Sequence, residues 1–183
     1  MAILGVDDIK AQLQGGGARP NLFQVTMNFP AGISGRASNL TGAGQTKASY
    51  MCKMASLPGS TIAPIEVPFR GRKLQIAGDR TFDPWSITVI NDTDFGVRNK
   101  YEEWMNSINE HKRNTGLTDP TSYMADMIVE QLDKDGSVLK KYDIRGTFPT
   151  TLGPIELDYG SENVIEEFEV ELQIQYWESN TTT

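Results

Sequence analysis

The residues best suited to covalent chemistry are Cys52 and His111, each the only one of its type among 183 residues. A cysteine nucleophile needs a neighbouring base, and no motif links these two positions. His111 lies near the end of a segment with helical periodicity, where a histidine is usually solvated. One Cys and one His cannot form an ordinary structural zinc site. We therefore expect no catalytic residue, and the single cysteine excludes an intramolecular disulfide.

Two short segments have some features of ion-binding and phosphate-binding loops. Residues 133–136 (Asp-Lys-Asp-Gly) carry acidic side chains, but Lys140 and Lys141 follow where a calcium loop needs further oxygen ligands. A hairpin turn explains these four residues. Residues 42–47 lack the Gly-Lys-Ser/Thr ending of a phosphate loop. We expect no cofactor and no fixed metal.

Charge is unevenly divided along the chain. Residues 1–100 hold 11 Lys/Arg and 7 Asp/Glu, and residues 101–183 hold 6 and 17, so the net charges of +4 and −11 give −7. Such an acidic protein does not grip the nucleic-acid backbone, which requires Lys and Arg. The abundant carboxylates leave a glycosidase function open, because glycoside hydrolysis uses a pair of carboxylates. Nothing in the sequence marks a particular pair, however.

Periodicity predicts one mainly β domain over residues 1–183 with one principal helix. Residues 85–90 alternate and are β-branched, which is typical of a strand. Capping residues follow at 91–94, and then apolar residues recur at helical spacing until about residues 114–116. A short first helix is expected around Val6, Ile9 and Leu13. Further strands are expected at 21–27, 50–54, 74–77, 125–132 and 138–144, and the proline-punctuated segment 56–73 is expected outside the centre of any sheet.

The most regular alternation covers residues 166–176, which we predict to be one strand. Its apolar face comprises Phe168, Val170, Leu172, Ile174 and Tyr176, and its polar face Glu167, Glu169, Glu171, Gln173 and Gln175. The period of two forces the apolar set to be the buried one. The predicted core consists of Trp85, Ile87, Val89, Trp104, Ile108, Phe168, Val170 and Leu172.

The two least regular segments are residues 30–46, expected to be a long loop, and residues 179–183, expected to be a flexible tail. No apolar stretch approaches the roughly 20 residues of a membrane span. No signal peptide is evident either.

Several motifs, in order, resemble the tail tube proteins of contractile-tailed bacteriophages. They are residues 18–25 (Ala-Arg-Pro-Asn-Leu-Phe-Gln-Val), residues 78–83 (Gly-Asp-Arg-Thr-Phe-Asp) with Trp85 and residues 89–92, and the ending at 168–170 and 176–178. Residues 53–58, 142–146, 148–150 and 157–159 also fit, so the resemblance covers roughly residues 6–178. Residues 30–46 depart from it as an apparent insertion.

The resemblance implies two packed antiparallel sheets flanked by a helix, in a β-sandwich or barrel-like domain. It also implies homo-hexameric rings that stack helically, with inner sheets joined into one barrel around a lumen. Expected partners are a tail sheath outside the tube, a baseplate or tube initiator and a tail terminator at its ends, phage DNA in transit without specific binding, and the host envelope during infection. The expected location is the virion, after synthesis in the host cytoplasm.

Two sets of residues have expected roles in such a tube, the first from the sign of its charge and the second from its composition, which is poor in core pattern and rich in Pro and Gly. The acidic strand face, Glu167, Glu169, Glu171, Gln173 and Gln175, is expected to line the lumen, because a wall of Glu and Gln repels phosphate. Subunit contacts are expected in residues 1–20, 30–46 and 56–73, and include Arg19, Pro20, Arg70, Arg72 and Lys73.

Three other functions remain open from the sequence. A phage-derived injection particle that carries protein cargo would use the same fold. A baseplate protein that starts the tube would usually carry an additional domain. A carbohydrate-active β-sandwich enzyme would be a soluble monomer with hydrolytic activity, which electron microscopy and an activity assay would distinguish from tubes.

Overall fold

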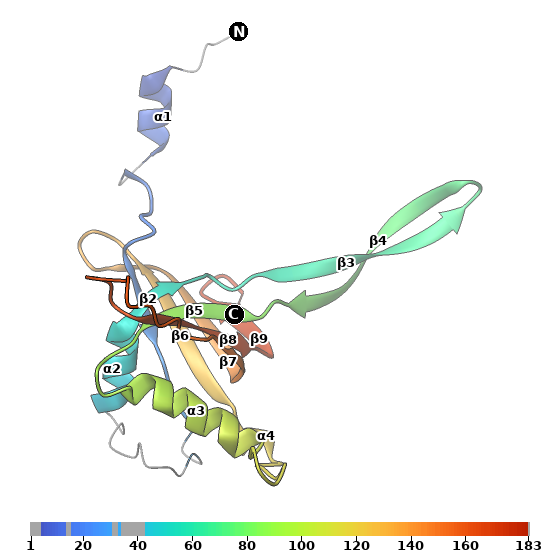
Figure 1. The fold of residues 1–183 in the computed structure, drawn as a ribbon. Coiled ribbons are helices and arrows are strands. Elements are labelled where there is room, and N and C mark those ends of the chain that lie inside the picture. Colours follow the sequence, from blue (N-terminus) through green and yellow to red (C-terminus); the bar gives the residue numbers. More distant parts are fainter. Residues whose placement is uncertain (1–4, 14–15, 31–32, 34–42, 183) are drawn as a thin grey trace.

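The computed structural model describes residues 5–13, 16–30, 33 and 43–182 of the protein (Figure 1). It is mainly β, with one principal helix, as predicted. Most of the expected loop at 30–46, residues 31–32 and 34–42, lies outside the described residues. The elements are α1 (Val6–Gln12), β1 (Phe23–Thr26), α2 (Ala43–Met51), β2 (Cys52–Ala55), β3 (Ser60–Phe69), β4 (Arg72–Phe82), β5 (Trp85–Ile90), α3 (Gly96–Ile108), α4 (Pro120–Tyr123), β6 (Ala125–Leu132), β7 (Val138–Leu152), β8 (Glu167–Gln173) and β9 (Tyr176–Ser179).

The 15-residue strand β7 organises the main sheet, whose strand order is β1-β6-β7-β8-β5-β2 with β9 also paired to β7. The first part of β7 pairs with β6 and β9, and its last part pairs with β8, always antiparallel. Between these parts lies Gly146 with φ +61°. Two half-sheets therefore share one strand: the first comprises β1, β6, β7 and β9, and the second comprises β7, β8, β5 and β2. This confirms the predicted pair of antiparallel sheets.

A single apolar core lies between the half-sheets and α3. Tyr101 and Trp104 of α3 stack at 6.1 Å between ring centroids, and the Phe29 ring meets both edge-on. The Trp104 indole Nε1 donates to the Tyr123 carbonyl oxygen at 2.6 Å, so this buried polar group is satisfied. Seven of the eight expected core residues are 2% exposed or less, and Ile108 is half-buried.

The principal helix is shorter than predicted and ends at Ile108, not near residues 114–116. After Asn109, which has extended dihedrals, the chain folds back so that the Leu117 amide donates to the Ser107 carbonyl oxygen. A Cβ on Gly116 would lie 2.0 Å from the Ile108 carbonyl oxygen. The polar residues after Ile108 offer no apolar surface to bury, so the close return of the chain replaces further helical turns.

Two helices occur where none was predicted, namely α2 and the four-residue α4. α2 includes residues 43–46, expected to be loop, and Tyr50 and Met51, expected to be strand; the strand itself is confirmed only from Cys52 onwards. Its Ala48 is buried, and Lys47 pairs with Asp92 and Asp94 in the loop before α3. Tertiary contacts therefore override the weak helix propensity of this segment.

The predicted strand at 166–176 is wrong as one element, because it ends at Gln173 and the chain moves from the second half-sheet to the first. At the crossing, the Gln175 amide donates to the Arg145 carbonyl oxygen at 3.1 Å. Tyr176 then begins β9 and is 46% exposed, not buried. The alternation in the sequence continues across this change of sheet, so periodicity alone does not reveal it.

The segment at 56–82 forms an arm rather than part of the main sheet. Within the described ranges, β3 and β4 pair only with each other, so residues 56–73 lie outside the centre of the main sheet, as expected. The expected strand at 74–77 lies inside the longer β4. Figure 1 shows the arm extending away from the body on one side, while α1 stands apart on another.

Within the described part of the chain, no helix is long and apolar enough to cross a membrane.

Candidate assembly surfaces

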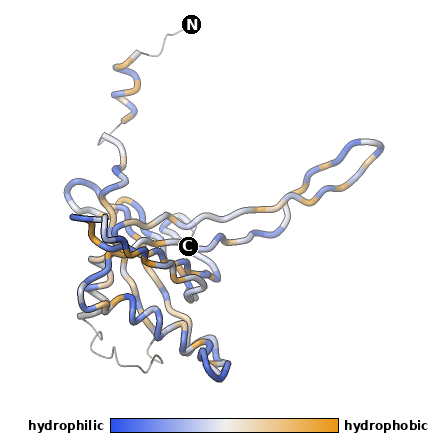
Figure 2. Tube along the Cα trace, in the orientation of Figure 1, coloured by the Kyte–Doolittle hydropathy of each residue, from blue (hydrophilic) through white to orange (hydrophobic). Residues whose placement is uncertain are grey.

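The arm formed by β3 and β4 is an amphipathic ribbon. Its register places Ile65 opposite Ile76 and Val67 opposite Leu74, and directly opposed residues share a face. Phe69, two residues beyond Val67, lies on the same face. All five side chains are 40–68% exposed, and Figure 2 shows apolar positions along both strands. We call Ile65, Val67, Phe69, Leu74 and Ile76 the apolar face of the arm.

The opposite face of the arm is polar and internally paired. Glu66 accepts hydrogen bonds from Lys73 and from Gln75, its cross-strand neighbour. The lysine is the first cause of a lowered pKa for the Glu66 carboxyl. This face therefore satisfies itself within the ribbon, whereas the apolar face has no partner among the described residues.

The tip of the arm is the two-residue turn Arg70–Gly71, which Arg72 follows. Arg70 and Gly71 have φ values of +47° and +84°, which match the left-handed conformation that such hairpin turns need. The Arg70 guanidinium lies 5.4 Å from the centroid of the Phe69 ring. Arg70 and Arg72 form no ion pair with any residue the structure describes. Together with Lys73, these expected contact residues are all exposed.

The acidic face of β8 lies on the outer side of the second half-sheet. Glu169 is exposed, and Glu167 and Glu171 are half-buried, while the intervening Phe168 and Val170 are buried. Glu167 pairs with Lys53 of β2, and the Glu171 carboxylate accepts from the Thr151 hydroxyl at 3.0 Å. The face is therefore partly neutralised at one end, which the sequence pattern did not indicate because Lys53 is distant in the chain.

The two glutamines of the predicted polar face, Gln173 and Gln175, lie in different places. Gln173 is half-buried at the end of the strand, and Gln175 is exposed at the crossing to β9. A Cβ on Gly146 would lie 2.7 Å from the Gln175 Cγ, so Gln175 covers the middle of β7. It does not continue the row of Glu167, Glu169 and Glu171.

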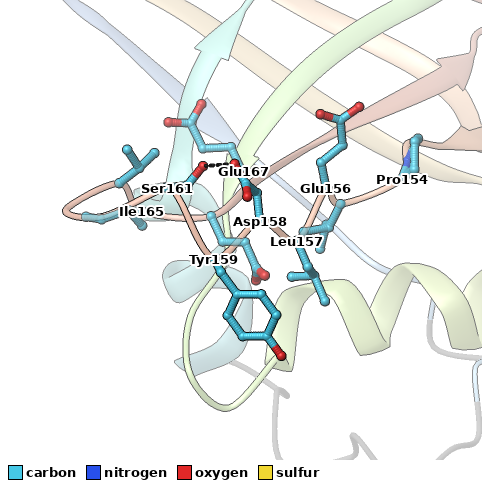
Figure 3. A pocket seen from close by; sticks show the side chains of 11 residues that line it. Pro154, Glu156, Leu157, Asp158, Tyr159, Ser161, Ile165 and Glu167 are labelled. Atoms are coloured by element: carbon cyan, nitrogen blue, oxygen red, sulfur yellow. Dashed lines mark hydrogen bonds between the residues drawn. The ribbon is translucent and has the colours of Figure 1, made fainter.

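A hollow of about 860 Å³ lies beneath the loop between β7 and β8 (Figure 3). Figure 3 shows Glu156 pointing to one side of this loop, and Leu157 and Tyr159 to the other. Apolar side chains that are normally buried are exposed here, including Leu157 at 84% and Val164 at 74%. The residues that line the hollow are Pro154, Ile155, Glu156, Leu157, Asp158, Tyr159, Ser161, Val164, Ile165, Glu166 and Glu167; we call it the 154–167 hollow.

Both ends of this loop are fixed to the body. At its start, the Gly153 carbonyl oxygen accepts from Arg98 Nη1 at 3.0 Å, and the Gly153 amide donates to the Glu169 carbonyl oxygen at 2.7 Å. At its end, the backbone amide of Asn91 donates to the Glu166 carbonyl oxygen, and the Asn91 side-chain Nδ2 donates to the Glu166 carboxylate. The loop is therefore held by its ends while its apolar middle faces solvent.

The sheet also has short open edges. Among the residues that the structure describes, β1 pairs only with β6 and β2 only with β5, and each contains four residues. The register of β2 shifts between Cys52 and Met54. Short and bulged strands are common devices at edges that must not pair indiscriminately. Near β1, Arg19 and Pro20 are exposed, and the Arg19 carbonyl oxygen accepts from Gln131 Nε2 at 2.6 Å.

The residues considered first for chemistry lie in ordinary surroundings. Burial raises the pKa of the Cys52 thiol to about 11, so the thiol is protonated at neutral pH. His111 is exposed, and its Nδ1 lies 2.9 Å from the Asn106 side-chain oxygen. Residues 133–136 form the expected turn, with Gly136 at φ +85°. No cluster of three or more potential metal ligands occurs in the described ranges.

Comparison with known proteins identifies the family of the chain. Residues 18–180 match the family described as phage tail tube protein. The chain is 37% identical to tail tube protein gp19 of Enterobacteria phage T4 over 175 residues, which cover 94% of this chain and 99% of that relative. It is 32% identical to the tail tube protein of Serratia phage KSP90 over 167 residues, covering 89% of each.

A chain in the cryo-EM structure of the anti-feeding prophage baseplate has the same fold, with a TM-score of 0.62 and 14% identity over 89% of this chain and 95% of that one. The family is established by the sequence relatives, whose identity to this chain is more than twice as high. The chain belongs to the phage tail tube protein family and is a structural component of a phage tail.

Proposed function

We propose that this chain polymerises as stacked hexameric rings into the inner tube of a contractile tail, through which DNA passes into the host. The observation that carries the proposal is the unpartnered apolar face of the arm in a member of the tail tube family. A two-stranded ribbon is marginally stable alone in water, so an exposed apolar ribbon on a folded body indicates a surface that is buried on assembly.

The second half-sheet is suited to form the tube wall. It is open at β2 on one side and at the last part of β7 on the other. Joining these edges between neighbouring copies would satisfy their free backbone groups and remove the edges, as closure of a barrel does. The buried face of β8 would then point into the subunit and its acidic face towards the lumen.

An acidic lumen would let DNA move without binding. In this arrangement Glu169 and Glu171 repel phosphate, while Lys53 is held by Glu167 and offers no free cation. Nucleic-acid affinity comes mainly from Lys and Arg at the backbone. We infer that Gln173 ends the row and that Gln175, at the crossing between half-sheets, contributes less than expected.

The remaining surfaces would contact other tail components. The sheath would lie outside the tube, and a baseplate or tube initiator and a terminator would cap its ends. We assign the chain no catalytic function, cofactor or metal.

Electron microscopy of the purified protein tests the assembly. Hollow tubes are the expected result, and monomers at every concentration and ionic strength would contradict the proposal.

The lumen assignment needs a separate experiment, because tubes could form with the other face inward. Phage carrying Glu169→Lys and Glu171→Lys, which leave the Lys53–Glu167 ion pair intact, should assemble tails but eject DNA more slowly, most clearly at low salt. The corresponding Gln double variant is the control, since it removes negative charge without adding cations. Ejection by the lysine variant at the normal rate would overturn the lumen assignment and leave tube formation untouched.

A further inference from the structure

We propose that the β3–β4 arm of one copy docks into the 154–167 hollow of a second copy, with its apolar face on the apolar side chains of that loop and its basic tip on the loop's acidic residues. This pairing rests on the proposed function, because it requires that copies of the chain assemble. It specifies which surface receives the arm.

The arm offers an apolar surface that its own copy does not cover. Phe69 is 68% exposed and Leu74 is 60% exposed, and they lie near the tip, where β3 and β4 contact no other element extensively. Ten residues of β3 span about 30 Å at the usual rise of a strand. Figure 1 shows this length directed away from the body. The tip is therefore placed to reach another copy and not its own loop.

The 154–167 hollow offers a matching apolar surface. Leu157, Val164 and Ile165 are 84%, 74% and 67% exposed, and Tyr159 projects fully into solvent. The volume of about 860 Å³ lies within the roughly 300–1,000 Å³ of ordinary ligand pockets, so it has room for several side chains. Because the loop is fixed by Gly153 and Glu166, it loses less conformational entropy on docking than a free loop would.

Charge selects this hollow among the apolar surfaces of the molecule. Arg70 and Arg72 have no carboxylate partner among the described residues, and Glu156 and Glu162 have no ion-pair partner there either. Residues 146–183 contain eight Asp or Glu and no Lys or Arg. No cation within this segment can therefore pair with Glu156 or Glu162. Opposite charges at the rim of an interface steer association and fix its register. The exposed Val6 and Ile9 of α1 lie beside Lys10 and two aspartates, and they are the rival acceptor.

A charge-reversal exchange tests the pairing. The variants are Arg70→Glu with Arg72→Glu, Glu156→Lys with Glu162→Lys, and the combination of all four. Each double variant should raise the critical concentration for tube assembly about tenfold, while the combination should restore it to within about threefold of the wild type. Lys112→Glu with Arg113→Glu makes the same charge change as the arm variant at another exposed site and should have little effect.

The outcomes separate this inference from the proposed function. Wild-type tubes establish assembly, whatever the variants do. Normal assembly of either double variant, or failure of the combination to recover, would overturn the pairing. Circular dichroism of the variants as monomers checks that they are folded, as expected for four exposed side chains.

Disulfide trapping gives an independent readout that does not depend on charge. In a Cys52→Ala background, Phe69→Cys with Tyr159→Cys should give a ladder of covalent oligomers on oxidation of assembled tubes. Phe69→Cys with Arg113→Cys should give none. A ladder from Phe69→Cys with Ile9→Cys, and none from the Tyr159 pair, would assign the arm to α1 and overturn the proposal.

Discussion

The body and the arm are built from similar antiparallel strands but bury their apolar residues in opposite ways. In β5 every second residue is buried, beginning with Trp85. In β3 every residue is exposed, although Ile65, Val67 and Phe69 alternate just as regularly. Alternation therefore indicates a strand with an apolar face but does not indicate which molecule covers that face. In the body the covering is α3 and the other half-sheet, and in the arm we infer that it is another subunit.

The largest effect is expected from truncating a buried aromatic residue of the body. Trp104→Ala removes a fully buried indole and its hydrogen bond to Tyr123, so the free energy of unfolding should fall by about 3–5 kcal/mol. Phe69→Ala in the arm should change that free energy by less than about 0.5 kcal/mol and reduce assembly instead. Urea unfolding of the monomers measures both. If the two variants lost equal stability, the contrast between body and arm would be wrong.

Removal of the arm should abolish assembly without destabilising the body. Replacing residues 62–80 with a short glycine-containing turn leaves Trp85 and the main sheet intact. The melting temperature should stay within a few degrees of the wild type, since few contacts link arm and body. Sedimentation should show no tubes. A large loss of melting temperature would mean that the arm supports the fold.

A smaller effect is expected at the register shift of the arm, where Gly78 allows a close approach of the two strands. A Cβ at this position would lie 2.5 Å from the Ala63 carbonyl oxygen, beside the register shift between Ile62 and Pro64. Gly78→Ala should displace the tip and raise the critical concentration a few-fold, with an unchanged melting temperature. The exposed neighbour Ala77, changed to Ser, provides the control. Equal assembly by both variants would show that the direction of the arm is not critical.

The smallest effect concerns ion pairs that attach α2 to the body. Lys47 donates to Asp92 and Asp94 and holds the pKa of both carboxyls below their usual value. The folded state thus binds fewer protons than the unfolded state at acidic pH. The contribution to stability is fully present above about pH 4 and is lost as pH falls through the lowered pKa values.

Asp92→Asn with Asp94→Asn should therefore lower the urea midpoint at pH 7 and leave a smaller difference from the wild type near pH 2. Asp79→Asn in the arm should not change the midpoint at either pH. A difference that stayed constant from pH 7 to pH 2 would show that these ion pairs do not contribute.

The sequence predicted the parts of the fold whose contacts are local and periodic. The alternation at Trp85, the helical spacing of Tyr101 and Trp104, and the turn ending at Gly136 each correspond to an observed element. The family also followed from ordered motifs. By contrast, α2 is packed through Ala48 and paired through Lys47 with Asp92 and Asp94, which lie more than 40 residues away in the chain, and the local sequence pattern alone favours a loop there.

The candidate surfaces were predictable only in part for the same reason. Arg70, Arg72 and Lys73, predicted as contact residues, lie at or beside an exposed turn, and their role in contacts stays a prediction. The hollow was missed because Leu157 and Ile165 look like ordinary core residues in the sequence. One signal was available: a long stretch between two strands with apolar residues but no regular period.

The shared strand β7 has a consequence for how the molecule opens. Because its backbone bonds to β6 and β9 in one part and to β8 in the other, unfolding of β7 would open both half-sheets at once. The amides around Ile144 and Thr147 should therefore exchange hydrogen only through global unfolding, whereas amides of the arm exchange through local opening at much lower free energy. In a subunit with this property, the arm can unfold and refold many times during assembly while the strands of the main sheet stay paired.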